Sequence, residues 1–143
     1  GYGQLDTRLR QDPRVVSMER TNARYPFHLP EVADIATVDI SFISLTKVLP
    51  AAVGVLKPEG IVICLIKPQF ELSRAEVGKG GIVRDPELRA KAVDGVREFV
   101  TRELKCSWEG LIESPITGMD GNVEFLARLQ LSGSRPDHAP DRE

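Results

Sequence analysis

The chain has 143 residues, enough for one domain with its own core; 41% are hydrophobic, 28% are charged, and 19 basic and 21 acidic side chains give a formal net charge of −2. This charge balance argues against a protein that binds nucleic acid over its whole surface, although it is compatible with a local basic patch. No apolar run is long enough to span a membrane and no signal peptide is visible, so we expect a soluble cytoplasmic protein.

The first half of the chain predicts a helix, two strands and a second helix. Leu5 and Leu9 give the first helix an apolar face. The second strand ends on a carboxylate, Asp39. Ser44 is a good N-cap for the second helix, in which Pro50 interrupts the hydrogen bonding. In chain order, we predict a short helix over residues 4–10, strands over residues 14–18 and 35–39, and a helix over residues 45–56.

The second half predicts three more strands and one long helix. A near-continuous apolar run over residues 61–66 is typical of a central strand of a parallel sheet. Asp85 followed by Pro86 predicts a helix start, with the aspartate as N-cap. The preceding residues 68–85 contain three glycines and predict a long loop, of a length that is usually functional or disordered. In chain order, we predict a turn over residues 57–60, strands over residues 61–66, 108–112 and 123–131, and the long helix between the first two of these strands.

The alternation of strands and helices predicts an α/β fold, with a mostly parallel sheet and an antiparallel last strand. We expect residues 1–131 to form one domain. Residues 132–143 are polar and contain two prolines, so we expect a flexible tail there.

Three ionisable side chains lie at the ends of predicted strands. Asp39 ends one strand, Lys67 follows the next, and Glu124 begins the last. Ligands in open α/β sheets bind outside the carboxyl ends of the parallel strands, and an antiparallel strand begins at that same edge. A neutral lysine there could deprotonate a hydroxyl, and a charged one could orient it or stabilise an oxyanion. The pattern therefore predicts a reactive cluster at one edge of the sheet.

Each of these residues also has a simpler interpretation. An aspartate after a strand is more often a turn or helix-cap residue, a lysine before proline is usually a solvated strand end, and Glu124 could face solvent. The remaining candidate ligands add little. Cys64 lies in an apolar run and forms no CxxC pair with Cys106, and no cysteine or histidine accompanies either of the two histidines, so we expect no metal site.

Several short motifs occur in order along the chain. They are Gly1-Tyr2-Gly3-Gln4-Leu5, Glu19–Arg24, Asp39–Ser44, Lys67-Pro68-Gln69-Phe70-Glu71, Val77–Asp85, Ser114–Gly118 and Gly121–Leu126. Together these motifs resemble the TlyA, or haemolysin A, family of FtsJ-type ribosomal RNA 2′-O-methyltransferases. The resemblance runs from Gly1 to about Leu131.

The resemblance implies a Rossmann-like methyltransferase fold that uses S-adenosylmethionine. Enzymes of this type use a Lys-Asp-Lys-Glu tetrad, of which Asp39, Lys67 and Glu124 match three members. The first tetrad lysine, the first strands with their glycine-rich cofactor loop, and the S4-like RNA-binding domain have no counterpart here. We therefore expect the carboxyl-terminal part of such a protein, with a fold that is truncated at its amino terminus.

The resemblance also implies roles for particular residues. Lys67 would be the base or orienting group for a ribose 2′-hydroxyl, and Asp39 and Glu124 would set its charge and position. Asn22 and Asp39 would bind the cofactor, with Asn22 contacting adenine; the simpler interpretation of Asn22 is a turn residue. The partner would be ribosomal RNA or a ribosomal subunit.

The glycine-containing loop carries three cations that could contact RNA phosphates, although an ordinary flexible loop would look the same. They are Arg74, Lys79 and Arg84. Residues 77–81 do not form a P-loop, because they lack its spacing and do not directly follow a strand.

Two other functions are compatible with parts of the sequence. The chain could be a non-catalytic remnant that associates with itself or a partner through an exposed sheet edge, since the strand ending at Asp39 would have an open edge. A nucleotide-dependent oxidoreductase is a weaker alternative, because no G-x-G-x-x-G follows a strand. Haemolysis has no support, since there is neither a membrane span nor a strongly amphipathic basic helix.

Overall fold

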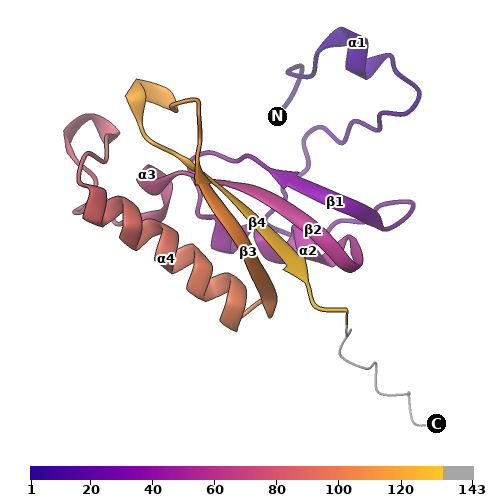
Figure 1. Ribbon diagram of the computed structural model, residues 1–143. Coiled ribbons are helices and arrows are strands. Elements are labelled where there is room, and N and C mark those ends of the chain that lie inside the picture. The colour runs from indigo at the N-terminus through magenta and orange to yellow at the C-terminus, as the bar shows by residue number, and fades with distance from the viewer. Residues whose placement is uncertain (134–143) are drawn as a thin grey trace.

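A computed structural model describes residues 1–133, so the predicted tail lies almost entirely outside the described residues (Figure 1). No helix in the described part is both long enough and apolar enough to cross a membrane. The elements in chain order are α1 (Thr7–Arg10), β1 (Ala33–Val38), the 3-10 helix η1 (Leu45–Lys47), α2 (Leu49–Gly54), β2 (Leu56–Ile66), α3 (Pro68–Glu71), η2 (Lys79–Gly81), α4 (Pro86–Arg102), β3 (Cys106–Glu113), η3 (Met119–Gly121) and β4 (Phe125–Leu131).

The four described strands form one mixed sheet in the order β1-β2-β4-β3. β1 and β2 are parallel, whereas β4 is antiparallel to both of its neighbours, β2 and β3. Three strands therefore point in one direction and the last strand opposes them, as the sequence predicts. Because β4 lies between β2 and β3, only one neighbouring pair, β1 and β2, is parallel, and the sheet is mixed.

The predicted strand at residues 14–18 does not form. This segment pairs with no described strand, and Val16 is 71% exposed. An extended segment needs a neighbour to accept and donate its backbone hydrogen bonds, and β1 pairs with β2 alone among the described strands. Ile35, in the middle of β1, is accordingly 57% exposed.

Local capping rules place the helix starts correctly. The Ser44 side chain accepts a hydrogen bond from the backbone N–H of Thr46, and Asp85 accepts one from Glu87 at the start of α4. The helix predicted over residues 45–56 is divided into η1 and α2, with Pro50 in the first turn of α2.

The predicted turn at residues 57–60 is a large bulge within β2. The strand register runs from Ala33 opposite Leu56 to Ile35 opposite Ile61. Between these two pairs β2 has four residues and β1 has one, so the extra residues of β2 have no partner in β1.

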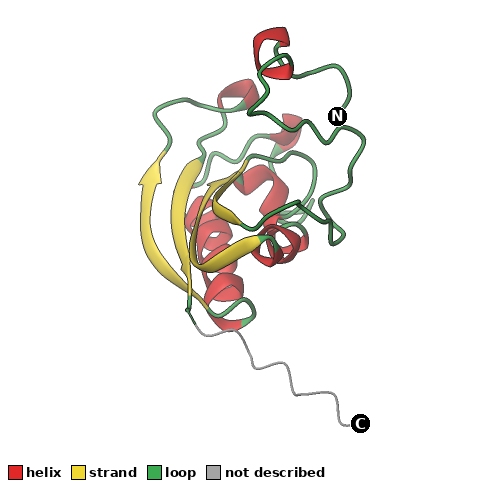
Figure 2. Ribbon diagram, turned by 90° about the vertical axis from the view of Figure 1, so that its right-hand side faces the viewer, coloured by secondary structure: helices red, strands yellow, loops and turns green. Residues whose placement is uncertain are grey.

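The core lies between the sheet and the helices α2 and α4 on one side of it, whereas α1, which buries no residue, lies apart (Figure 1 and Figure 2). From Gly60 to Ile66, alternate residues of β2 are buried, while the residues between them are half-buried. The buried side chains come mainly from β2 (Val62, Cys64, Ile66), β4 (Ala127, Leu129), α4 (Val93, Val96, Val100) and the segment after β1 (Leu45, Leu49).

Candidate functional site

The sheet register brings the three predicted site residues to one edge. Asp39 immediately follows β1 and Lys67 immediately follows β2, its parallel neighbour. β4 runs the other way, and its first residue, Phe125, pairs with Ile66 at the end of β2. The next position along this antiparallel register sets Glu124 opposite Lys67.

Lys67 is in direct contact with Asp39. Its Nζ lies 2.7 Å from Asp39 Oδ1 and donates a hydrogen bond to Ser41 Oγ at 3.0 Å. The lysine side chain is only 12% exposed, whereas that of Asp39 is 72% exposed. Lys67 is therefore not a solvated strand end: its amine is largely withdrawn from water, and an open carboxylate neutralises it. Ser41 was not predicted, although it lies two residues after Asp39 in the same motif.

Glu124 lies in the same region but does not pair with Lys67. Its residue is 6% exposed, and its Oε2 accepts a hydrogen bond from Gln69 Nε2 at 3.0 Å. Because Glu124 is buried, the interpretation that it faces solvent is wrong. Among the described residues no ion pair involves Glu124, so it does not pair with Lys67 either. Gln69 belongs to the Lys-Pro-Gln-Phe-Glu motif and was missed as a site residue. Its Oε1 is buried and has no hydrogen-bond partner in the described part of the chain.

Gly118 leaves the space that the Glu124 carboxylate occupies. A Cβ atom built on Gly118 would lie 2.1 Å from Oε2 and 3.0 Å from Oε1 of Glu124. The φ of Gly118, −77°, is one that any residue adopts, so its backbone conformation does not require glycine. Glycine is required here because a side chain would collide with the Glu124 carboxylate. The sequence shows this glycine but not the carboxylate against it.

The loop after β1 and the segment after β2 touch along their lengths. The rings of Phe42 and Phe70 lie 5.0 Å apart at 54°. Glu71 Oε2 accepts a hydrogen bond from Ser44 Oγ at 2.6 Å, and its Oε1 accepts one from Leu45 N at 2.8 Å. Burial raises the pKa of the Glu71 carboxyl above its usual value, against the effect of these two hydrogen bonds.

Asn22 forms the turn that its simpler interpretation predicts. Its Oδ1 accepts a hydrogen bond from Arg24 N at 3.0 Å, and its backbone carbonyl accepts one from Tyr25 N. Its side chain is exposed. The cofactor contact stays a prediction.

The long loop predicted between β2 and α4 contains two short helices, α3 and η2, so less of it is irregular than the sequence predicts. Asn122, which is buried, fastens it: Asn122 Oδ1 accepts a hydrogen bond from Val83 N at 3.0 Å, and Nδ2 donates one to Gly81 O at 2.9 Å. The three predicted RNA-binding cations are exposed, and none forms an ion pair with a described residue. They are Arg74, Lys79 and Arg84.

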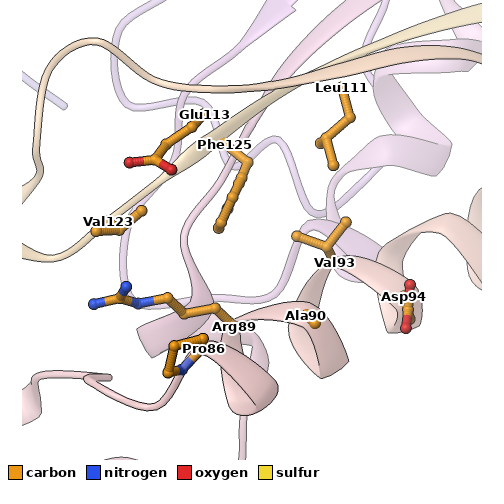
Figure 3. Close-up of a pocket in the computed structure, with 9 residues that line it drawn as sticks. All are labelled: Pro86, Arg89, Ala90, Val93, Asp94, Leu111, Glu113, Val123 and Phe125. Carbon is orange, nitrogen blue, oxygen red and sulfur yellow. The ribbon is translucent and has the colours of Figure 1, made fainter.

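A separate pocket lies between α4 and the β3–β4 pair (Figure 3). Its wall is mostly apolar and includes Phe125 and Val93, and its charged members are Arg89, Asp94 and Glu113. Arg89 Nε donates a hydrogen bond to Val83 O at 3.0 Å, which ties the arginine to the protein. The pocket lining contains neither Asp39, Lys67 nor Glu124.

Comparison with known proteins identifies close relatives over nearly the whole chain. The FtsJ-like methyltransferase family model matches residues 1–131. The 16S/23S rRNA (cytidine-2′-O)-methyltransferase TlyA of Mycobacterium tuberculosis is 45% identical over 139 residues, covering 94% of this chain and 51% of the relative. Hemolysin A of Brachyspira hyodysenteriae is 39% identical over 134 residues, covering 90% of this chain and 55% of the relative.

A solved structure gives the same result for the fold. A protein from Streptococcus thermophilus that is described as a candidate hemolysin superposes with a TM-score of 0.88 and 41% sequence identity. The match covers 99% of this chain and 52% of that protein. The chain thus spans about half the length of the relatives that it matches.

Proposed function

Because this chain belongs to the FtsJ-like methyltransferase family, we propose that it carries the reacting edge of an S-adenosylmethionine-dependent ribosomal RNA 2′-O-methyltransferase. The observation that supports this function best is the withdrawn amine of Lys67, held by Asp39 at 2.7 Å and Ser41 at 3.0 Å. This pair lies where parallel strands end, the usual ligand edge of an α/β sheet.

The chemistry needs one aligned nucleophile. When bound, S-adenosylmethionine would supply the methyl group, and the residues of this edge would have to align the ribose hydroxyl oxygen with it and receive the hydroxyl proton. A lysine amine has three hydrogen positions, and Asp39 and Ser41 occupy two of them. The third is free to orient the hydroxyl, and a neutral amine would instead accept its proton. Glu124 would act indirectly: its hydrogen bond from Gln69 would hold in place the segment that begins at Lys67.

The donor set is compatible with a nucleoside cofactor at this edge. Asp39 presents an open carboxylate that can accept hydrogen bonds from hydroxyl or amino groups, and the buried Oε1 of Gln69 lacks a donor. Asp39 and Asn22 would hold S-adenosylmethionine. When bound, this cofactor supplies a methyl group on a positively charged sulfur.

The RNA would meet the segment that follows β2. The exposed cations Arg74, Lys79 and Arg84 could contact phosphate oxygens, which positions a strand without reading its sequence. An RNA substrate in the ribosome also implies that the protein acts in the cytoplasm.

The decisive experiment measures transfer of a radiolabelled methyl group from S-adenosylmethionine to ribosomal subunits. Replacing Lys67 with alanine should reduce the rate at least about 100-fold, the usual scale for a lost general base. The chain provides a matched control, because Lys57 pairs with Asp34 at 2.7 Å at the opposite end of the same two strands. Lys57→Ala should leave the rate unchanged. Equal rates for Lys67→Ala and the parent chain would refute the assignment.

A second candidate function is self-association through the open edge of β1. The observation in its favour is that β1 pairs on one side only among the described strands, with Ile35 exposed beside the free backbone groups. Sedimentation of the purified chain separates the two functions when combined with calorimetry on S-adenosylmethionine. A dimer that binds no cofactor, and that Ile35→Lys converts to a monomer, would support the non-catalytic function.

A further inference from the structure

The position of Asp39 depends on a loop that carries backbone strain. Residues 39–44 connect the end of β1 to η1, and Asp39 is the first residue of this loop. Within the loop, Phe42 has a φ of +65°, a left-handed conformation that is unfavourable for a bulky side chain. Such a conformation persists only where the surroundings hold it, so the loop needs an anchor at each end. β1 provides the first anchor.

Glu71 is in the position of the second anchor. Its two carboxylate oxygens bind two consecutive residues at the end of the loop, Ser44 Oγ at 2.6 Å and Leu45 N at 2.8 Å. Glu71 comes from α3, which begins one residue after Lys67. The carboxylate therefore connects the segment that carries the lysine to the loop that carries its partner.

We propose that Glu71 is a positioning residue: by holding the end of the loop at residues 39–44 against α3, it holds Asp39 and Ser41 beside Lys67. This inference rests on the proposed function only for its consequence in catalysis, because the contact between the two segments exists without substrate.

A merely local helix cap would not be coupled to the lysine amine, and this difference can be measured. The probe is an amine-selective acetylating reagent, with the rate at Lys67 followed by peptide mass spectrometry relative to the exposed Lys57. If Glu71 holds the loop, Glu71→Ala should raise the relative rate at Lys67 about fivefold, the equivalent of about 1 kcal/mol of lost local stability. Glu71→Gln keeps an acceptor for Leu45 N and a polar group for Ser44, and should restore the parent rate.

Glu76 is a matched control on the next segment. It also accepts hydrogen bonds from a serine hydroxyl and a backbone N–H, in its case both from Ser73, but it has no contact with the loop at residues 39–44. Glu76→Ala should leave the rate at Lys67 unchanged. Ser44→Ala removes one of the two Glu71 contacts together with the cap bond from Thr46 N and should raise the rate about twofold, so the inference stays testable if Glu71→Ala does not fold.

The result that overturns the inference is an unchanged Lys67 rate in a folded Glu71→Ala or Ser44→Ala variant. A Glu71→Gln variant as reactive as Glu71→Ala would also overturn it. In the methyl-transfer assay, Glu71→Ala should lower kcat and raise KM for S-adenosylmethionine, because a displaced Asp39 would serve neither the lysine nor the cofactor. If the parent chain transfers no methyl group, the proposed function fails, whereas the acetylation rates still decide the role of Glu71.

Discussion

Replacing Gly118 with alanine should destabilise the protein through one buried carboxylate. The new methyl group would lie 2.1 Å from Oε2 and 2.5 Å from Cδ of Glu124, closer than any non-bonded contact allows. The backbone at Gly118 has ordinary dihedral angles, so alanine introduces no conformational strain of its own. Any loss of folding free energy must therefore come from displacement of Glu124.

The magnitude follows from the contact that is lost. Displacing Glu124 breaks its 3.0 Å hydrogen bond from Gln69, and a bond to an ionised group contributes about 1.5–3 kcal/mol. Exchanging glycine for alanine returns about 0.4–1 kcal/mol by restricting the unfolded chain. We therefore expect the free energy of unfolding to fall by about 1–2 kcal/mol.

The assay is urea unfolding of four chains: the parent, Gly118→Ala, Glu124→Ala and the double variant. Without the Glu124 carboxylate the alanine methyl group has room, so the cost of Gly118→Ala should disappear in the Glu124→Ala background. Gly110→Ala is the control, since nothing lies within 4 Å of a Cβ atom there. An equal cost of Gly118→Ala in both backgrounds would refute this explanation.

Three further outcomes are expected. Asn122→Ala leaves the backbone N–H of the buried Val83 without a partner and frees the carbonyl of the exposed Gly81, and it should lower the free energy of unfolding by about 1–3 kcal/mol in urea titrations. Hydrogen bonds from Lys91, first, and from Ser73 lower the pKa of Glu76 to about 2, so their stabilisation is present above pH 4.5 and is lost as the pH falls toward 2; carboxyl NMR titration of Lys91→Ala should show a pKa that rises but stays below 4.5, because the Ser73 bonds remain. Burial raises the pKa of Cys64 to about 12 and also raises that of Cys106, so a thiol reagent at pH 8 should react with neither until the protein unfolds.

Features that depend on neighbouring residues could be predicted from the sequence. The caps at Ser44 and Asp85 are local hydrogen bonds, and the β-branched apolar run at residues 61–66 favours a buried strand. The same logic explains why Asp39 and Lys67 were predicted to meet, because the ends of adjacent parallel strands share an edge.

Features that depend on distant partners could not be predicted. The segment at residues 14–18 has the composition of a strand, but a strand also requires a neighbour, and composition contains no information about one. The glycine of the Ser-Pro-Ile-Thr-Gly motif resembles any turn glycine until Glu124 is placed against it. Likewise, Glu71 is an ordinary polar residue in the sequence, and only the folded chain brings it to the end of the loop after Asp39.

The register between β2 and β4 determines which residues meet at this edge of the sheet. Lys67 faces Glu124 only because Ile66 pairs with Phe125; a slip of one residue would place Val123 or Phe125 opposite the lysine instead. Such a slip would leave a cation beside an apolar side chain and would also turn the buried face of β4 outward. A chain that folds with the wrong register would therefore lose the placement of Glu124 at this edge together with part of its core, so an intact edge reports that the final strand is correctly paired.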